Sequence, residues 1–100
     1  MKVLIDGETV RIAELNELTA TNANSVRDHA RAAFGHGQRH IEVDLSEASL
    51  VDSCGLGALV ALHKTACDRG GTLRLLHPRP PIQQILELTR MHRVFDVVKP

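Results

Sequence analysis

Large aromatic side chains are almost missing from this sequence of 100 residues, which has no tryptophan, no tyrosine and only two phenylalanines. Proteins that bind single-stranded nucleic acid stack its bases on aromatic rings, and this sequence offers almost no such rings. An excess of positive charge is missing as well, because 12 lysines and arginines are balanced by 12 aspartates and glutamates. We therefore do not expect direct binding of nucleic acid.

Cysteine is also scarce, and long apolar runs are absent. Cys54 and Cys67 form no C-x-x-C pair, which fits a reducing compartment better than a disulfide framework. His36 and His40 span a glycine-rich loop, with no nearby cysteine or carboxylate pattern to complete a metal site. No apolar run approaches the roughly 18 residues of a membrane helix, and residues 1–7 break into a turn too early for a signal peptide. The expected protein is cytoplasmic, with no metal, cofactor or membrane insertion.

The overall composition is that of a folded domain. Hydrophobic residues make up 43% of the chain and charged residues 24%. These are globular proportions, and a chain of this size can bury enough apolar surface to fold without disulfides or metals. We expect residues 1–100 to form a single domain, present as a monomer or a weak homodimer.

The order of local patterns predicts an α/β fold. Asp6-Gly7-Glu8 separates the β-prone segments 3–5 and 9–13, which is typical of a hairpin. A strand, a helix and a strand joined by short loops then predict a right-handed parallel βαβ unit. We expect a compact domain with a mixed sheet, an N-terminal antiparallel hairpin and about three to four helices. The expected helices run from Ser25 to Gly35, from about 55 to 68 and onward from Pro81. The later strands are expected at 40–45 and 72–76, and residues 94–98 form either a last strand or a short closing segment.

The helix expected over residues 55–68 has two different faces. At 100° per residue, one arc should pack on the sheet. The opposite arc has small side chains near its start, so another protein could approach it closely, unless these residues merely tolerate exposure. The expected buried arc is Leu56, Leu59, Val60, Leu62, His63, Ala66 and Cys67, and the outward arc is Gly57, Ala58, Ala61, Lys64, Thr65 and Asp68.

Ser53 lies between an apolar, strand-like segment and this helix. The first N–H groups of a helix lack intrahelical partners, and the helix dipole is positive there, so a phosphate group is favoured at this position. Capping of the helix by Asp52 or Ser53 is the alternative. Nucleophilic catalysis is disfavoured, because the segment lacks the glycine that precedes the serine by two residues in the G-x-S-x-G turn. Ser53 is therefore a candidate phosphoacceptor, and we predict no catalytic residue.

The segment from Asp52 to Gly57 has the sequence D-S-C-G-L-G. It resembles the signature D-S-[ST]-G-L-G that lies at a strand-to-helix turn in the STAS domain of bacterial anti-sigma factor antagonists. Cys54 stands where that family usually has a second serine or threonine. Thr19 stands where an aspartate is common, in a segment that usually has the sequence G-E-L-D-A. The other similar segments, in the family's order, are 44–46, 62–64, 70–75 and 85–89.

The resemblance implies a partner-switching regulator that is not an enzyme. In that family the unmodified antagonist binds an anti-sigma factor, which is also a serine kinase with a histidine-kinase-like ATPase fold, and so releases the sigma factor. The kinase phosphorylates the serine after the aspartate, here Ser53, and a metal-dependent serine phosphatase reverses the modification. Together with the smooth helix face, the resemblance predicts partner binding by Asp52, Ser53, Cys54, Gly55, Gly57, Ala58, Ala61, Thr19 and Thr21.

An alternative function follows from the same resemblance. STAS domains also serve as constitutive scaffold subunits of stressosomes and of membrane lipid-transport complexes. In that alternative, the helix face docks permanently and Ser53 is only a helix cap.

Overall fold

Five strands form one sheet in their order along the chain. In the computed structural model, which describes residues 1–100, β1 pairs with β2 in antiparallel fashion and every later pair is parallel. The mixed sheet, the N-terminal hairpin and the parallel βαβ unit are thus confirmed. The elements are β1 (Lys2–Asp6), β2 (Thr9–Ala13), α1 (Ala23–Ala33), β3 (His40–Asp44), α2 (Ser53–Cys67), β4 (Leu73–Leu76), α3 (Pro80–Leu88), the 3-10 helix η1 (Met91–Arg93) and β5 (Asp96–Val98).

The hairpin between β1 and β2 closes through a two-residue turn. Asp6 pairs with Thr9, which leaves Gly7 and Glu8 as the central turn residues. Gly7 has a φ of +58°, the left-handed value that a type II′ turn requires at its first central position. Glycine adopts this conformation at little cost, so the Asp-Gly signal fixes the register of the first two strands.

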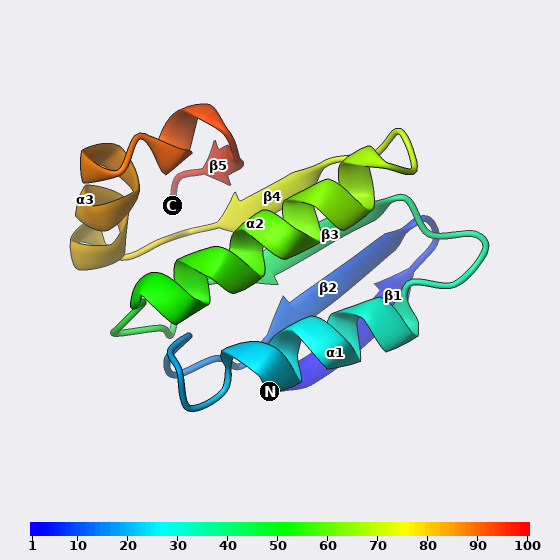
Figure 1. The fold of residues 1–100 in the computed structure, drawn as a ribbon, viewed down its shortest axis with the longest axis horizontal. Coiled ribbons are helices and arrows are strands. Elements are labelled where there is room, and N and C mark those ends of the chain that lie inside the picture. The colour runs from blue at the N-terminus through cyan, green and yellow to red at the C-terminus, as the bar shows by residue number, and fades with distance from the viewer.

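The crossover helices α1 and α2 lie side by side on one face of the sheet, as Figure 1 shows. Helix α1 packs on β1 and β2, and α2 packs on β3 and β4. Helix α3 and η1 connect β4 to β5 and lie at the side of the molecule where β4 ends and α2 begins (Figure 1). No helix of the protein is long and apolar enough to span a membrane.

Alternation along the strands separates an apolar face of the sheet from a polar one. Val10, Ile41 and Leu75 have no or almost no exposed surface and belong to one core of 20 buried residues beneath the helices. The other face carries charges in register across the strands. Arg11 Nη2 donates to Glu42 Oε1 over 2.8 Å, and this interaction raises the pKa of the guanidinium. Parallel sheets usually have both faces covered, whereas here polar side chains keep the second face compatible with water.

The expected orientation of α2 is wrong by part of a turn. Ala58, expected on the outward arc, is 5% exposed, whereas Val60, expected in the core, is 44% exposed. Cys67 is also exposed rather than buried. Because α1 packs along one side of α2, the buried surface extends between the sheet and α1 and is not centred on the sheet alone. The buried residues of α2 are Gly55, Ala58, Leu59, Leu62 and Ala66.

Candidate functional site

The start of α2 is fixed by the backbone of a loop that lies far away in sequence. Leu18 and Val51 form an isolated parallel bridge. The Leu18 N–H donates to the Leu50 carbonyl over 2.9 Å, and the Asp52 N–H donates to the Leu18 carbonyl over 3.3 Å. The segments after β2 and β3 are thus joined by one further parallel bridge beyond the ends of these strands. This bridge fixes the direction in which the chain enters α2.

Asp52 is the residue that caps α2. Its Oδ1 accepts from the Gly55 N–H over 2.9 Å, the usual geometry of an N-cap, while its Oδ2 accepts from the Ala20 N–H over 3.0 Å. These backbone donors, with Gly55 the strongest and Ala20 next, lower the pKa of the Asp52 carboxyl. Asp52 therefore joins the start of α2 to the loop before α1, and its carboxylate is held ionised.

Gly55 is required by close packing against the Leu18 backbone. A Cβ atom at this position would lie 2.0 Å from the Leu18 carbonyl oxygen. The missing side chain of Gly55 therefore makes room for the Leu18 backbone, so Gly55 is needed for packing inside the protein. Gly57 differs, since a Cβ there would meet nothing within 4 Å.

Ser53 is the first residue of α2, and its side chain is exposed. Its hydroxyl makes no hydrogen bond within the protein, because the capping role belongs to Asp52. The helix behind it has 15 residues, long enough for its dipole to favour an anion at the first turn. The site thus presents a free hydroxyl to solvent at a position that tolerates added negative charge.

An exposed strip runs along α2 from this serine, and we call it the outer stripe. It consists of Ser53, Gly57, Val60 and Lys64, which share one side of the helix and are all exposed. Leu50 lies in the segment between β3 and α2 and is exposed as well. We call residues 50–53, where the chain enters α2, the Ser53 corner. Sequence reasoning missed Val60 and Leu50 as surface residues, although the small residues at 55, 58 and 66 could have revealed the packed side of α2.

The predicted partner-binding residues fall into two groups. Cys54 and Thr21 are exposed near Ser53, and Ala61 is half-buried. Thr19, however, is only 5% exposed, and its hydroxyl donates to Glu17 Oε1 over 3.2 Å. Like Gly55 and Ala58, it supports the surface from beneath. The Ala20–Asp52 hydrogen bond nevertheless brings the predicted loop and the predicted helix start together.

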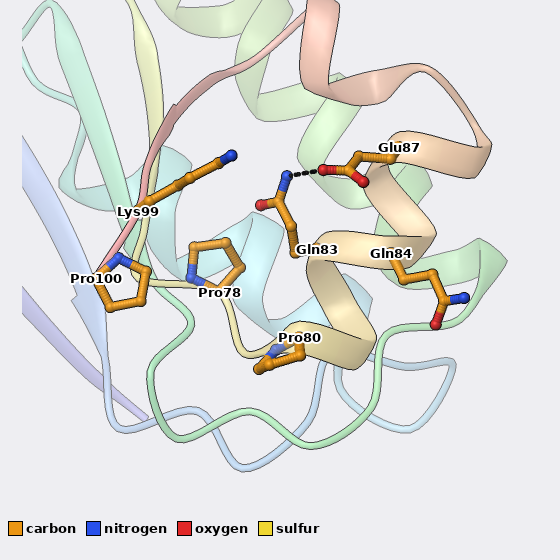
Figure 2. Close-up of a pocket in the computed structure, with 7 residues that line it drawn as sticks. All are labelled: Pro78, Pro80, Gln83, Gln84, Glu87, Lys99 and Pro100. Atoms are coloured by element: carbon orange, nitrogen blue, oxygen red, sulfur yellow. Dashed lines mark hydrogen bonds between the residues drawn. The ribbon is translucent and has the colours of Figure 1, made fainter.

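None of the three hollows on the surface is lined by Ser53. One of about 320 Å³ lies between α3 and the last residues of the chain, and Figure 2 shows Gln83 and Glu87 there, joined by a 2.8 Å hydrogen bond. The structure also brings together no group of three or more histidine, cysteine, aspartate or glutamate side chains that could hold a metal ion. The Ser53 hydroxyl therefore lies on an open surface and not inside one of these hollows.

Comparison with known proteins identifies the fold family. Residues 7–100 match the STAS domain. The chain belongs to the STAS domain family. Among curated STAS relatives, a Thermotoga maritima protein assigned as an anti-sigma factor antagonist is 28% identical over 82 residues, which cover 81% of this chain and 73% of the relative. The anti-sigma F factor antagonist of Paenibacillus polymyxa is 24% identical over 82 residues, covering 81% of this chain and 70% of its own length.

Solved structures share this STAS fold. The crystal structure of a Thermotoga maritima protein with the same assignment has a TM-score of 0.87 at 24% identity, covering 99% of this chain and 86% of that one. Unphosphorylated SpoIIAA, an anti-sigma factor antagonist, has a TM-score of 0.83 at 20% identity, with 98% and 87% covered. SpoIIAA of Bacillus in its phosphorylated form has a TM-score of 0.74 at 20% identity, with 98% and 90% covered.

Proposed function

We propose that this STAS domain is an anti-sigma factor antagonist that acts in the cytoplasm by switching partners. In its unmodified form it binds an anti-sigma factor through the Ser53 corner and the outer stripe, and so frees a sigma factor. The anti-sigma factor, a serine kinase with a histidine-kinase-like ATPase fold, phosphorylates Ser53 and ends the binding, and a serine phosphatase restores it. The observation that carries this proposal is the exposed, unbonded Ser53 hydroxyl at the first position of a helix capped by its neighbour.

The known relatives support this role. Two curated relatives are assigned as anti-sigma factor antagonists. SpoIIAA, which has the same fold, has been solved in both an unphosphorylated and a phosphorylated form. A fold that accommodates both states in one protein is a suitable scaffold for the same switch in another.

Phosphorylation of Ser53 should leave the fold intact. The modification adds about 1.5 to 2 negative charges. The helix dipole favours each negative charge by roughly 0.3 to 1 kcal/mol, while the ionised Asp52 carboxylate next to it opposes the addition. Because Asp52 caps α2 and the exposed Ser53 side chain makes no hydrogen bond, no native hydrogen bond has to break.

The same phosphate would have a large effect at an interface. A partner shaped to fit a neutral hydroxyl would have to desolvate a dianion without an ion pair, at a cost of several kcal/mol. Each 1.4 kcal/mol weakens binding about tenfold, so the modification would reduce affinity by about 100-fold or more. The switch therefore acts on binding and not on folding.

The alternative of a permanent scaffold subunit treats Ser53 as a helix cap. The capping contact in this protein is instead made by Asp52, which removes the structural task assigned to Ser53 in that alternative. The Ser53 hydroxyl is therefore available for modification, which favours the switch over the scaffold role.

Two substitutions at Ser53 test the proposal with the anti-sigma factor as the binding partner. Ser53→Asp should abolish binding while the free energy of unfolding changes by less than about 1 kcal/mol. Ser53→Ala should bind like the unmodified protein and accept no phosphate from the kinase and ATP. Ser25→Asp is a matched control, because it adds the same charge at an exposed site in the first turn of α1. Normal binding by Ser53→Asp, or equal loss in the Ser25→Asp control, would contradict the proposal.

A further inference from the structure

Strand β1 is an unprotected edge of the sheet. It pairs only with β2, so one side of its backbone has no partner strand. Leu4 is 42% exposed and Ile5 is 57% exposed, although both belong to this strand. Edge strands are normally guarded by short length, charged side chains, proline or a bulge. β1 has no proline and no bulge, and its only charges are at its two ends, on Lys2 and Asp6.

The hairpin geometry determines which backbone groups of β1 face outward. In a two-residue hairpin the residues next to the turn, here Asp6 and Thr9, form a hydrogen-bonded pair. Hydrogen-bonded and non-hydrogen-bonded pairs alternate along antiparallel strands. Leu4 therefore also bonds to β2, while Val3 and Ile5 direct their N–H and C=O groups to the free edge.

The sequence of β1 is complementary to itself in the antiparallel direction. It has the sequence K-V-L-I-D. If two copies pair about Leu4, then Lys2 lies opposite Asp6 of the second copy, and Val3 lies opposite Ile5 of the second copy. The residues whose backbone groups face outward are thus the ones that pair, and the charges at the two ends are opposite in sign.

We propose that β1 pairs in antiparallel fashion with β1 of a second copy, forming a homodimer with one continuous sheet. Leu4 meets Leu4 of the second copy at the two-fold axis, as a non-hydrogen-bonded pair whose side chains approach closely. A shift of the pairing by two residues in either direction keeps the backbone hydrogen-bonding pattern but moves Lys2 away from Asp6 of the second copy. One shift brings Lys2 opposite Leu4, and the other brings it opposite Glu8, which belongs to the turn and not to the strand. Only the register about Leu4 pairs opposite charges within the strands.

The helices fit this arrangement. Because α1 packs on β1 and β2, the two copies of α1 would be about two strand spacings apart, roughly 10 Å, which is an ordinary distance between packed helices. Helix α2 packs on β3 and β4, farther from the β1 edge (Figure 1). The dimer would leave both Ser53 corners free and would present two of them in one particle.

Charge-exchange variants test this interface by analytical ultracentrifugation of protein without an N-terminal tag. The wild type should form dimers reversibly as its concentration rises to about 1 mM, as expected for a small interface. Lys2→Asp and Asp6→Lys should each remain monomeric, because each places like charges opposite each other. An equimolar mixture of these two variants should dimerise, because every pair across the interface is again of opposite sign.

Circular dichroism of each variant should show an unchanged fold, since both substituted side chains are exposed. Leu4→Arg gives a second check, because it brings two positive charges together at the two-fold axis and should also prevent dimers. A wild type that stays monomeric at every concentration would overturn the proposal, even if the β1 edge then binds a strand of another protein. Dimers of unchanged strength in both single charge variants would overturn it as well.

Discussion

Two glycines in α2 should respond oppositely to the same substitution. In Gly55→Ala, the new Cβ would lie 2.0 Å from the Leu18 carbonyl oxygen, so α2 and Leu18 must separate by about 1 Å to reach a tolerable contact. Overpacking of this kind costs about 1 to 3 kcal/mol, and loss of the adjoining Asp52–Leu18 backbone hydrogen bond adds about 1 kcal/mol. We expect Gly55→Ala to lower the free energy of unfolding by about 2 to 4 kcal/mol.

Gly57→Ala is the matched control, because its Cβ would enter open space in the same helix. Replacing glycine by alanine inside a helix should stabilise the protein by about 0.5 to 1 kcal/mol. Urea unfolding measures both effects, and with a slope of about 2 kcal/mol per molar the Gly55→Ala midpoint should fall by roughly 1 to 2 M. If the two variants have equal stability, the described contact between α2 and Leu18 is incorrect.

Three other substitutions probe the cap, the outer stripe and the core. Asp52→Asn should destabilise the protein most above about pH 4. The pKa of the Asp52 carboxyl is lower in the folded than in the unfolded protein, so the carboxylate stabilises the fold above the unfolded pKa, and this stability is lost as the pH falls through the folded pKa. Urea unfolding at neutral and acidic pH measures the effect, and a stability difference that is independent of pH would argue against it. Val60→Asp should weaken binding of the anti-sigma factor by tenfold or more, estimated at about 1.4 kcal/mol, without lowering the unfolding midpoint, because Val60 is exposed; calorimetric titration measures the affinity, and unchanged affinity would remove Val60 from the interface. Leu62→Ala should lower the free energy of unfolding by about 2 to 5 kcal/mol, because Leu62 is fully buried, and a loss below 1 kcal/mol would contradict its place in the core.

The sheet could be predicted from the sequence because its signals are local. The Asp6-Gly7 turn determines the hairpin, and the β-branched residues Ile41 and Val43 alternate with polar ones along β3. Glycines and prolines at the ends of the helices gave boundaries within about two residues of those observed. These features depend on neighbours in the chain and need no knowledge of the tertiary structure.

The details of α2 could not be predicted in the same way. Apolar residues occur on all its sides, so periodicity alone could not tell the face against α1 from the face in solvent, and Ala58 and Val60 were exchanged. The roles of Gly55 and Thr19 depend on the loop at 15–22, which reaches α2 only in the folded protein. Asp52 and Ser53 were correctly placed at the helix start, but only the hydrogen bonds decide which of them is the cap.

The most direct test of the account is to compare the affinity of unmodified and Ser53-phosphorylated protein for the anti-sigma factor. The protein would be phosphorylated with the anti-sigma factor kinase and ATP, its modified residue located by mass spectrometry, and its affinity measured by titration. We expect phosphate on Ser53 alone and an affinity lower by about 100-fold or more. Phosphate on another residue, or equal affinity of the two forms, would contradict it.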